Sequence, residues 1–221
     1  MPKIILASTS PNRRLLLDAA GAEYEVASPG AVREKMSGAP PERLVVENAL
    51  AKARAVAKKA ASGIIVGADT IVVFKKEIFG KPADGKHAGQ ILSKLAGNAH
   101  EVVSGVAVVD AATGRESTGL ERTKIFFKPA TPAQIREYAA TGEPMGAAGA
   151  YKMQGKGAFL VEKMEGSYSN VMGLPLEKLS KILEQFGVRL DEKRIKAVGP
   201  KTFAASEFTS QKKRSGKKNW G

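Results

Sequence analysis

The segment Ser8–Arg14 gathers hydroxyl and guanidinium groups between an apolar run and the predicted start of a helix. Ser8 and Ser10 supply the hydroxyls, and the guanidinium groups of Arg13 and Arg14 match the geometry of phosphate oxygens. A helix N-terminus adds free backbone N–H groups and the positive end of the helix dipole. We interpret the segment as a candidate phosphate-binding loop. It lacks the Walker pattern, so an ordinary capped helix with solvated arginines is the alternative.

A carboxylate follows a buried apolar run at Asp69. Ile64–Ala68 is predicted to be a buried strand, with Asp69 and Thr70 at its end. A carboxylate in such a place is costly unless it has a cationic partner or a metal ion. Asp69 is therefore a candidate general base or metal ligand, and the alternative is an aspartate in a turn.

Two lysines and one glutamine are further candidates for ligand binding. Lys52 lies four residues after Asn48 on an Ala-rich helix, and Lys81 is held between a glycine and a proline. Either lysine could contact phosphate, although a solvated helix face and a turn lysine are the simpler interpretations. Gln154 lies in the glycine-rich segment 149–157, where small residues allow close approach to a flat ligand. Its amide suits the edge of a base, and a flexible loop is the alternative.

These side chains are carried by alternating strands and helices. Strands are expected at 4–7, 24–27, 64–68, 71–74, 101–109, 118–127 and 159–164, with a hairpin-like return at 78–82. Helices are expected at 11–20, 41–61, 87–95, 131–140 and 175–186. Some neighbouring strands are joined too briefly to be parallel. The pattern predicts an α/β fold with a mixed sheet flanked by helices.

Composition narrows the functional classes. The chain has no cysteine and only two histidines, which excludes disulfides and thiolate metal sites and argues against a histidine-rich zinc site. No apolar run approaches the length of about 20 residues that a membrane span needs, and we expect a cytoplasmic protein. The net charge of +13 is compatible with nucleic-acid binding or with a pocket for a small polyanion. The basic run lacks interleaved aromatic residues, so we regard nucleic acid as an improbable partner.

The charge is concentrated at the C-terminal end. Residues 189–221 hold ten Lys or Arg against three Asp or Glu. We predict one domain over 1–190 and a basic, disordered tail over 191–221. The run from Lys212 to Lys218 is interpreted as a solvated extension, with a nuclear localisation signal as the alternative.

Six segments in a fixed order resemble the Maf-like nucleotide pyrophosphatases: LASTSPNRRLLL, ENALAKA, GADT, GKP, GAYKMQGKGAFLVEKMEG and SNVMGLPL. The resemblance runs from about residue 3 to residue 188. It implies a bent mixed sheet with two lobes around a central cleft, related to the inosine-triphosphate pyrophosphatase architecture. It also implies cleavage of the α–β phosphoanhydride of nucleoside triphosphates, a divalent cation (Mg²⁺ or Mn²⁺) and a homodimer.

The resemblance implies a role for each candidate residue. Asp69 is expected to be the catalytic proton acceptor. The positions that handle phosphate or metal are Ser8, Arg13, Glu34, Lys52 and Lys81, with Glu34 and Asp69 as the metal ligands. The positions that distinguish the subfamilies are Asn12, Thr70 and Gln154.

Thr70 and Gln154 resemble the branch that acts on dTTP and UTP. The branch that acts on 7-methyl-GTP typically has glutamine and glutamate at these places, and an acidic side chain would suit a cationic methylated base. Departures from the pyrimidine branch are Asn12 for a common arginine, Arg33 for an acidic residue, Ser104 for threonine, and Gly146-Ala147 for an Asp-Lys pair. They bear on substrate range more than on reaction type. A regulatory role in cell division, independent of Asp69, is a further alternative.

Overall fold

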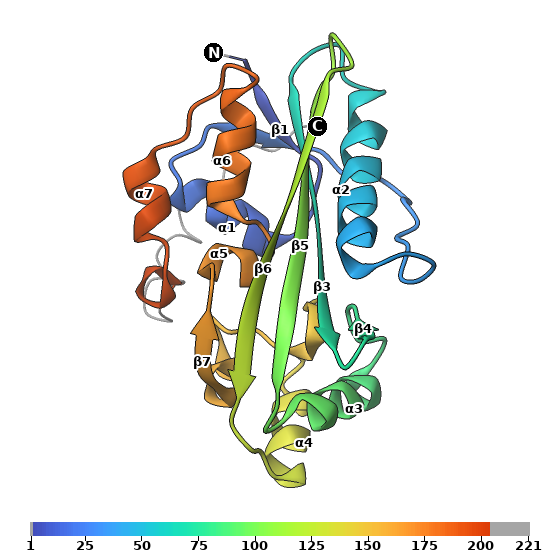
Figure 1. Cartoon of the computed structure of the whole chain (residues 1–221), viewed down its shortest axis with the longest axis vertical. Helices are drawn as coiled ribbons and strands as arrows, with labels where there is room; N and C mark the ends of the chain where they lie inside the picture. Colours follow the sequence, from blue (N-terminus) through green and yellow to red (C-terminus); the bar gives the residue numbers. More distant parts are fainter. Residues whose placement is uncertain (1, 204–221) are drawn as a thin grey trace, which may run out of the picture.

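A mixed sheet runs through the length of the computed structural model, which describes residues 2–203 (Figure 1). The strands are β1 (Ile4–Leu6), β2 (Tyr24–Val26), β3 (Ile64–Phe74), β4 (Glu77–Phe79), β5 (Ala99–Asp110), β6 (Glu116–Phe127) and β7 (Val161–Glu165). Their order is β2-β1-β3-β5-β6-β7, and β4 pairs with β3. β1 is parallel to β2 and β3, whereas the other pairs are antiparallel. The mixed α/β prediction is confirmed.

The helices cover both faces of this sheet. They are α1 (Pro11–Ala19), α2 (Pro41–Ala57), α3 (Gly85–Leu95), α4 (Pro132–Ala140), α5 (Tyr168–Val171), α6 (Leu176–Glu184) and α7 (Glu192–Ala197). Short 3₁₀ turns cover Ala148–Ala150, Lys156–Leu160 and Pro200–Phe203. Figure 1 shows α2 on one side of β3 and β5, with α1 and α6 on the other and α3 and α4 at the far end. No helix in the described part of the chain is both long and apolar enough to cross a bilayer.

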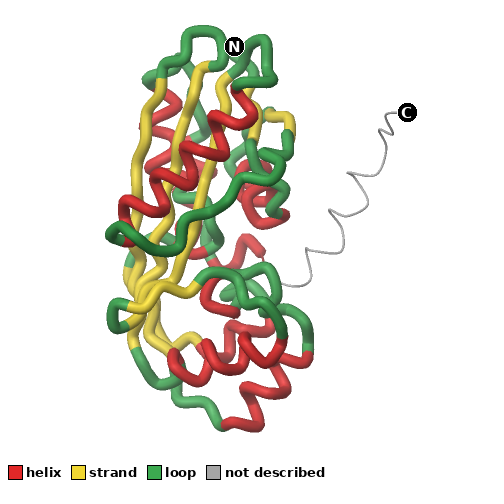
Figure 2. Tube along the Cα trace, turned by 90° about the vertical axis from the view of Figure 1, so that its right-hand side faces the viewer, coloured by secondary structure: helices red, strands yellow, loops and turns green. Residues whose placement is uncertain are grey.

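Two buried clusters lie one after the other along the same face of the sheet. The first joins Val66 and Ala68 of β3 to α1 and α6, and the second joins Val72 to α3 and α4. Between them, Thr70 and Ser104 face each other as a polar pair on β3 and β5. The long strands continue from one lobe into the other (Figure 2). The two-lobed architecture is therefore built on strands that both lobes share.

One edge of β3 is left open at the junction of the lobes. β5 pairs with one edge along residues 64–73, while β1 pairs with the other edge only at Ile64–Val66 and β4 only at Val72–Phe74. Residues 67–71 therefore have a strand neighbour on one side only. Asp69 and Thr70, predicted at the end of a strand, lie in its middle. The strand continues through these two polar residues because β3 stays paired with β5 along residues 64–73.

The structured part of the chain extends beyond the predicted boundary at residue 190. Asp191 accepts hydrogen bonds from the backbone N–H groups of Lys193 and Arg194 at the start of α7. Ile195 and Phe203 are buried in the same cluster as α1 and α6. The prediction of disorder from residue 191 is thus wrong for residues 191–203, because two apolar side chains anchor this segment. The basic run from Lys212 lies outside the described residues.

Candidate active site

Asp69 points from β3 toward α2, and two glycines explain how the helix comes so close. A Cβ atom at Gly67 would lie 2.2 Å from the carbonyl oxygen of Ala49, and one at Gly105 would lie 2.4 Å from that of Val45. Gly105 is the β5 partner of Asp69, so both glycines are on the same face of the sheet as the carboxylate. The missing side chains let the α2 backbone rest directly on the sheet.

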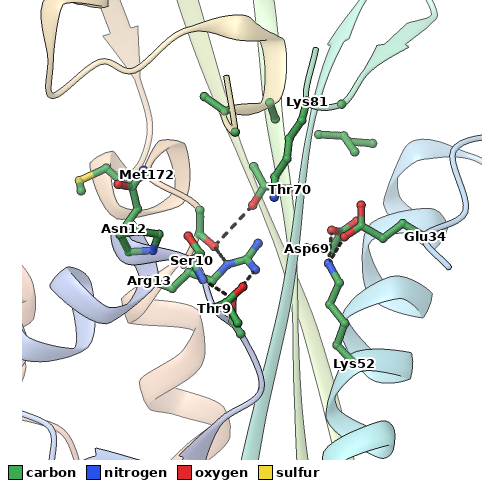
Figure 3. A pocket seen from close by; sticks show the side chains of 18 of the residues that line it. Thr9, Ser10, Asn12, Arg13, Glu34, Lys52, Asp69, Thr70, Lys81 and Met172 are labelled. Atoms are coloured by element: carbon green, nitrogen blue, oxygen red, sulfur yellow. Dashed lines mark hydrogen bonds and ion pairs between the residues drawn. The ribbon is translucent and has the colours of Figure 1, made fainter. Parts of the chain in front are cut away.

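This close packing brings one face of α2 onto the carboxylate. Lys52 Nζ lies 2.7 Å from Asp69 Oδ1, and Asn48 Nδ2 donates to Asp69 Oδ2 at 2.9 Å. Lys52 Nζ also lies 2.6 Å from Glu34 Oε1, and this glutamate comes from the segment before α2. Asp69 and Lys52 are 4% and 7% exposed, so the Lys52 ammonium is compensated by the two carboxylates rather than by solvent. Figure 3 shows both carboxylates at the end of the Lys52 side chain.

Cations other than Lys52 also act on these carboxylates. Partial burial alone would raise the pKa of Glu34, but its hydrogen bond to Lys52 and the charges of Lys52, Lys81 and Arg13 together lower that pKa. Burial lowers the pKa of the Arg13 guanidinium, while the negative charges of Asp69 and Glu34 counteract the shift. Arginine stays protonated despite such a shift. Three cations from separate parts of the chain therefore act on one pair of carboxylates.

Arg13 and Thr70 lie on the other side of the β3 ribbon (Figure 3). Arg13 Nε donates to the carbonyl oxygen of Gly173 at 2.8 Å, and one of its terminal nitrogens donates to Ser8 Oγ at 3.1 Å. The Thr70 and Ser104 hydroxyls are 2.9 Å apart. Adjacent residues of a strand point to opposite faces, which separates Thr70 from Asp69. The open edge of β3 lets both groups reach one cleft.

A cleft of about 410 Å³ is lined by every residue to which the resemblance gave a role, whereas Arg14, also considered for phosphate, is exposed and does not line it. Its lining includes Ser8, Asn12, Arg13, Glu34, Lys52, Asp69, Thr70, Lys81 and Gln154. These residues come from the loop after β1, the first turn of α1, the segment before α2, α2 itself, β3, the loop after β4 and the late glycine-rich segment. The structure thus assembles the predicted set from distant parts of the chain.

Sequence reasoning missed three groups that support these residues. Asn48 fixes Asp69 and also exchanges two hydrogen bonds with the backbone of Lys35, in the segment that carries Glu34. Its spacing of four residues from Lys52 was a usable signal. The Gly173 carbonyl and the Asn170 side chain, which donates to Thr123 Oγ1, hold the turn beneath Arg13. The residue types of Gly173 and Asn170 gave no indication of this structural role.

The two carboxylates fit a divalent cation of the kind that triphosphate-processing enzymes use. Asp69 and Glu34 both approach the single point occupied by Lys52 Nζ, so their oxygens converge on a position that accepts positive charge. Mg²⁺ is typically held by one or two carboxylates and completes its shell with phosphate oxygens and water. Within residues 2–203, no group of three or more His, Cys, Asp or Glu side chains is arranged to hold an ion. The remaining ligands would come from substrate and water.

Comparison with known proteins gives a consistent picture. The family model described as Maf-like protein matches residues 3–186. Proteins named dTTP/UTP pyrophosphatase are similar along most of the chain. Those from Geotalea uraniireducens and Gloeobacter violaceus are 48% and 47% identical, covering 83% and 85% of this chain and 95% and 98% of their own. A Staphylococcus aureus Ham1 structure covers 96% of this chain and 98% of its own, with a TM-score of 0.46 and 11% identity.

Proposed function

The chain belongs to the Maf-like protein family, and on that premise we propose that it hydrolyses dTTP and UTP to the nucleoside monophosphate and pyrophosphate. The observation that carries the proposal is the cleft in which three cations, Arg13, Lys52 and Lys81, act on the carboxylates of Asp69 and Glu34. Such an arrangement suits a compact polyanion that must be bound and then attacked by water. The names of the relatives supply the choice of nucleotide.

Binding of the triphosphate is assigned to residues on both sides of the β3 edge. Arg13 and Lys81 supply positive charge from opposite lobes, and the loop Ser8–Ser10 precedes the N-terminus of α1. Ser10 makes no side-chain cap at that helix, so the start of α1 keeps donors for an anion. Lys52 already contacts two carboxylates and gains anionic phosphate oxygens as further partners when the nucleotide enters.

The chemical step is an in-line displacement at the α-phosphorus. The oxygen of a water molecule forms a bond to this phosphorus, and the bond from the α-phosphorus to the bridging oxygen breaks. The electron pair of that bond leaves with pyrophosphate. Asp69 Oδ1 accepts the proton from the water once Lys52 shifts toward the phosphates, while the hydrogen bond from Asn48 keeps the carboxylate oriented.

A divalent cation belongs to the proposal, with Asp69 and Glu34 as its protein ligands. When bound, it would offset charge on the phosphate oxygens and orient the triphosphate. Lys52 Nζ lies between the same two carboxylates, so it offsets part of their charge when no cation is bound. This pairing avoids the large cost of two adjacent, uncompensated carboxylates.

Base selection is assigned to Gln154, which lines the same cleft. Its neutral amide has one acceptor and two donors, which matches the alternating donors and acceptors on the imide edge of uracil and thymine. A cationic 7-methylguanine would be better matched by a carboxylate. Gln154 therefore supports pyrimidine substrates, with 7-methyl-GTP as the runner-up.

A screen of nucleoside triphosphates, followed by pyrophosphate release with Mg²⁺, Mn²⁺ or EDTA, tests the proposal. We expect turnover of dTTP and UTP with either cation and none with EDTA. Preference for 7-methyl-GTP would move the chain to the runner-up, and the absence of pyrophosphate with every nucleotide would refute the activity. A homodimer, also part of the proposal, is tested by light scattering of the full chain.

A further inference from the structure

The segment that carries Gln154 has few regular backbone hydrogen bonds of its own. Between the 3₁₀ turn Ala148–Ala150 and β7, it runs through turns and a second 3₁₀ turn at Lys156–Leu160. A glutamine can discriminate between bases only if its amide is held in one place. Whatever fixes this segment therefore matters for the choice of base.

One carboxylate outside the cleft lining holds this segment through hydrogen bonds. Glu143, in the loop after α4, accepts hydrogen bonds from the backbone N–H of Lys156 at 3.0 Å and from that of Gly157 at 2.9 Å. It also accepts one from the Tyr138 hydroxyl at 2.9 Å. Hydrogen bonds to an ionised acceptor are stronger than those between neutral groups. Glu143 therefore binds the two residues that begin the second 3₁₀ turn, just after Gln154.

Tyr138 extends the same connection to the other side of Gln154. Its hydroxyl accepts a hydrogen bond from the backbone N–H of Lys152 at 3.1 Å and donates to Glu143. Tyr138 is buried in the second core cluster, so the hydroxyl is fixed by the packing of α4. Burial raises the pKa of Tyr138, which keeps the hydroxyl protonated as a donor. Residues 152 and 156–157 are thus held by one continuous pair of side chains.

The glycines of this segment are explained by the same pair. A Cβ atom at Gly155 would lie 2.5 Å from Glu143 Oε2, and one at Gly157 would lie 2.5 Å from the Tyr138 hydroxyl. The sequence analysis related these small residues to the approach of a flat ligand. In the structure, Gly155 and Gly157 make room for Glu143 and Tyr138. The segment therefore packs closely against the side chains of Glu143 and Tyr138.

We propose that Glu143, supported by Tyr138, is a positioning residue for base recognition that fixes residues 152–157 and thereby places Gln154 in the cleft. This inference rests on the proposed function, because Gln154 is taken there as the residue that reads the base. Glu143 contacts neither the phosphate-binding residues nor Asp69. Its loss should impair discrimination between bases more than cleavage itself.

The test compares Glu143→Ala and Glu143→Gln with Glu137→Gln, a matched control at an exposed glutamate of α4. The readout is the ratio of kcat/KM for UTP to that for CTP, with kcat and KM determined separately. We expect Glu143→Ala to lower this ratio about 10-fold, mainly through a higher KM for UTP. Glu143→Gln keeps one acceptor oxygen and should have a smaller effect. The control should leave the ratio unchanged.

A second measurement does not depend on activity. Hydrogen exchange of the Lys156 and Gly157 amides should be faster in Glu143→Ala than in the unsubstituted chain and unchanged in Glu137→Gln. If Glu143→Ala does not fold, Tyr138→Phe replaces it, because that change removes only the hydroxyl. An unchanged UTP to CTP ratio in a folded variant, or unchanged exchange of both amides, would overturn the inference. If no nucleotide is hydrolysed, the proposed function fails, while the exchange data still report on Glu143.

Discussion

The parts of the cleft that we propose to bind phosphate and base, called the phosphate end and the base end below, are built in different ways. At the phosphate end, Asp69 and Lys52 belong to β3 and α2, and α2 rests on the sheet at Gly67 of β3 and Gly105 of β5. At the base end, Gln154 belongs to a segment of turns that side chains hold from outside. Residues on regular elements that pack against each other cannot move without disturbing the core. The proposed chemistry is therefore coupled to folding, whereas the proposed choice of base depends on a few separable contacts.

The largest expected effect is at the phosphate end. Asp69→Asn keeps the shape of the side chain but removes the proton acceptor, so hydrolysis of every nucleotide should fall about 1,000-fold. Initial rates for several triphosphates, with thermal unfolding as a check on folding, provide the measurement. Retention of most of the activity would show that Asp69 is not the proton acceptor.

As the pH falls, the contact between His100 and Tyr151 should be destabilised before Glu34 is affected. His100 Nε2 lies 3.0 Å from the hydroxyl of Tyr151, which lines the cleft, and burial lowers the pKa of His100 to about 4. Because the unfolded chain binds this proton near pH 6.5, the stabilisation is complete above that pH and is lost as the pH falls toward 4. The loss should be about 3 kcal/mol of the free energy of unfolding.

Urea unfolding between pH 7 and 4 measures this loss. The lowered pKa of Glu34, by contrast, means that its stabilising contribution is lost only at more acidic pH. His100→Phe should flatten the dependence above pH 4.5, whereas substitution of the exposed His87 should not. Equal slopes in both variants would contradict the assignment to His100.

The contact between α2 and β3 can be tested directly. Gly67→Ala places a methyl group against the α2 backbone and should cost about 2 kcal/mol of the free energy of unfolding. It should also lower kcat/KM for all nucleotides by a similar factor, since Lys52 and Asn48 move together. Gly89→Ala on α3 is the control, because a Cβ atom there meets no other atom and alanine favours the helix. A selective loss of one nucleotide would argue against a rigid phosphate end.

The smallest change concerns the base end alone. Gln154→Glu removes the amide donors and should lower kcat/KM for UTP about 10-fold. The value for 7-methyl-GTP should rise relative to UTP, because a carboxylate attracts the cationic base. Steady-state kinetics with both nucleotides decide the matter. A uniform loss for both would mean that Gln154 does not select the base.

The sequence predicted the residues of the phosphate end better than the structural features that hold the cleft in place. Asp69 was recognisable because a carboxylate beside a buried strand needs a partner, and the resemblance supplied Lys52 and Glu34. Its position in the middle of β3 was not predictable, because strand pairing with β5 depends on residues far along the chain. The order of residues 191–203 was missed since it depends on a few dispersed apolar side chains, the buried Ile195 and Phe203 and the partly buried Val198. Glu143 was missed because it acts through backbone groups that it reaches only after folding.

Hydrolysis of dTTP in ¹⁸O-labelled water tests most directly whether the cleft directs water to the α-phosphorus. The account predicts that the label appears in dTMP, that unlabelled pyrophosphate is the second product, and that Asp69→Asn suppresses both. Label in pyrophosphate, or release of orthophosphate and dTDP, would place the attack at another phosphorus and contradict the assignment of the site.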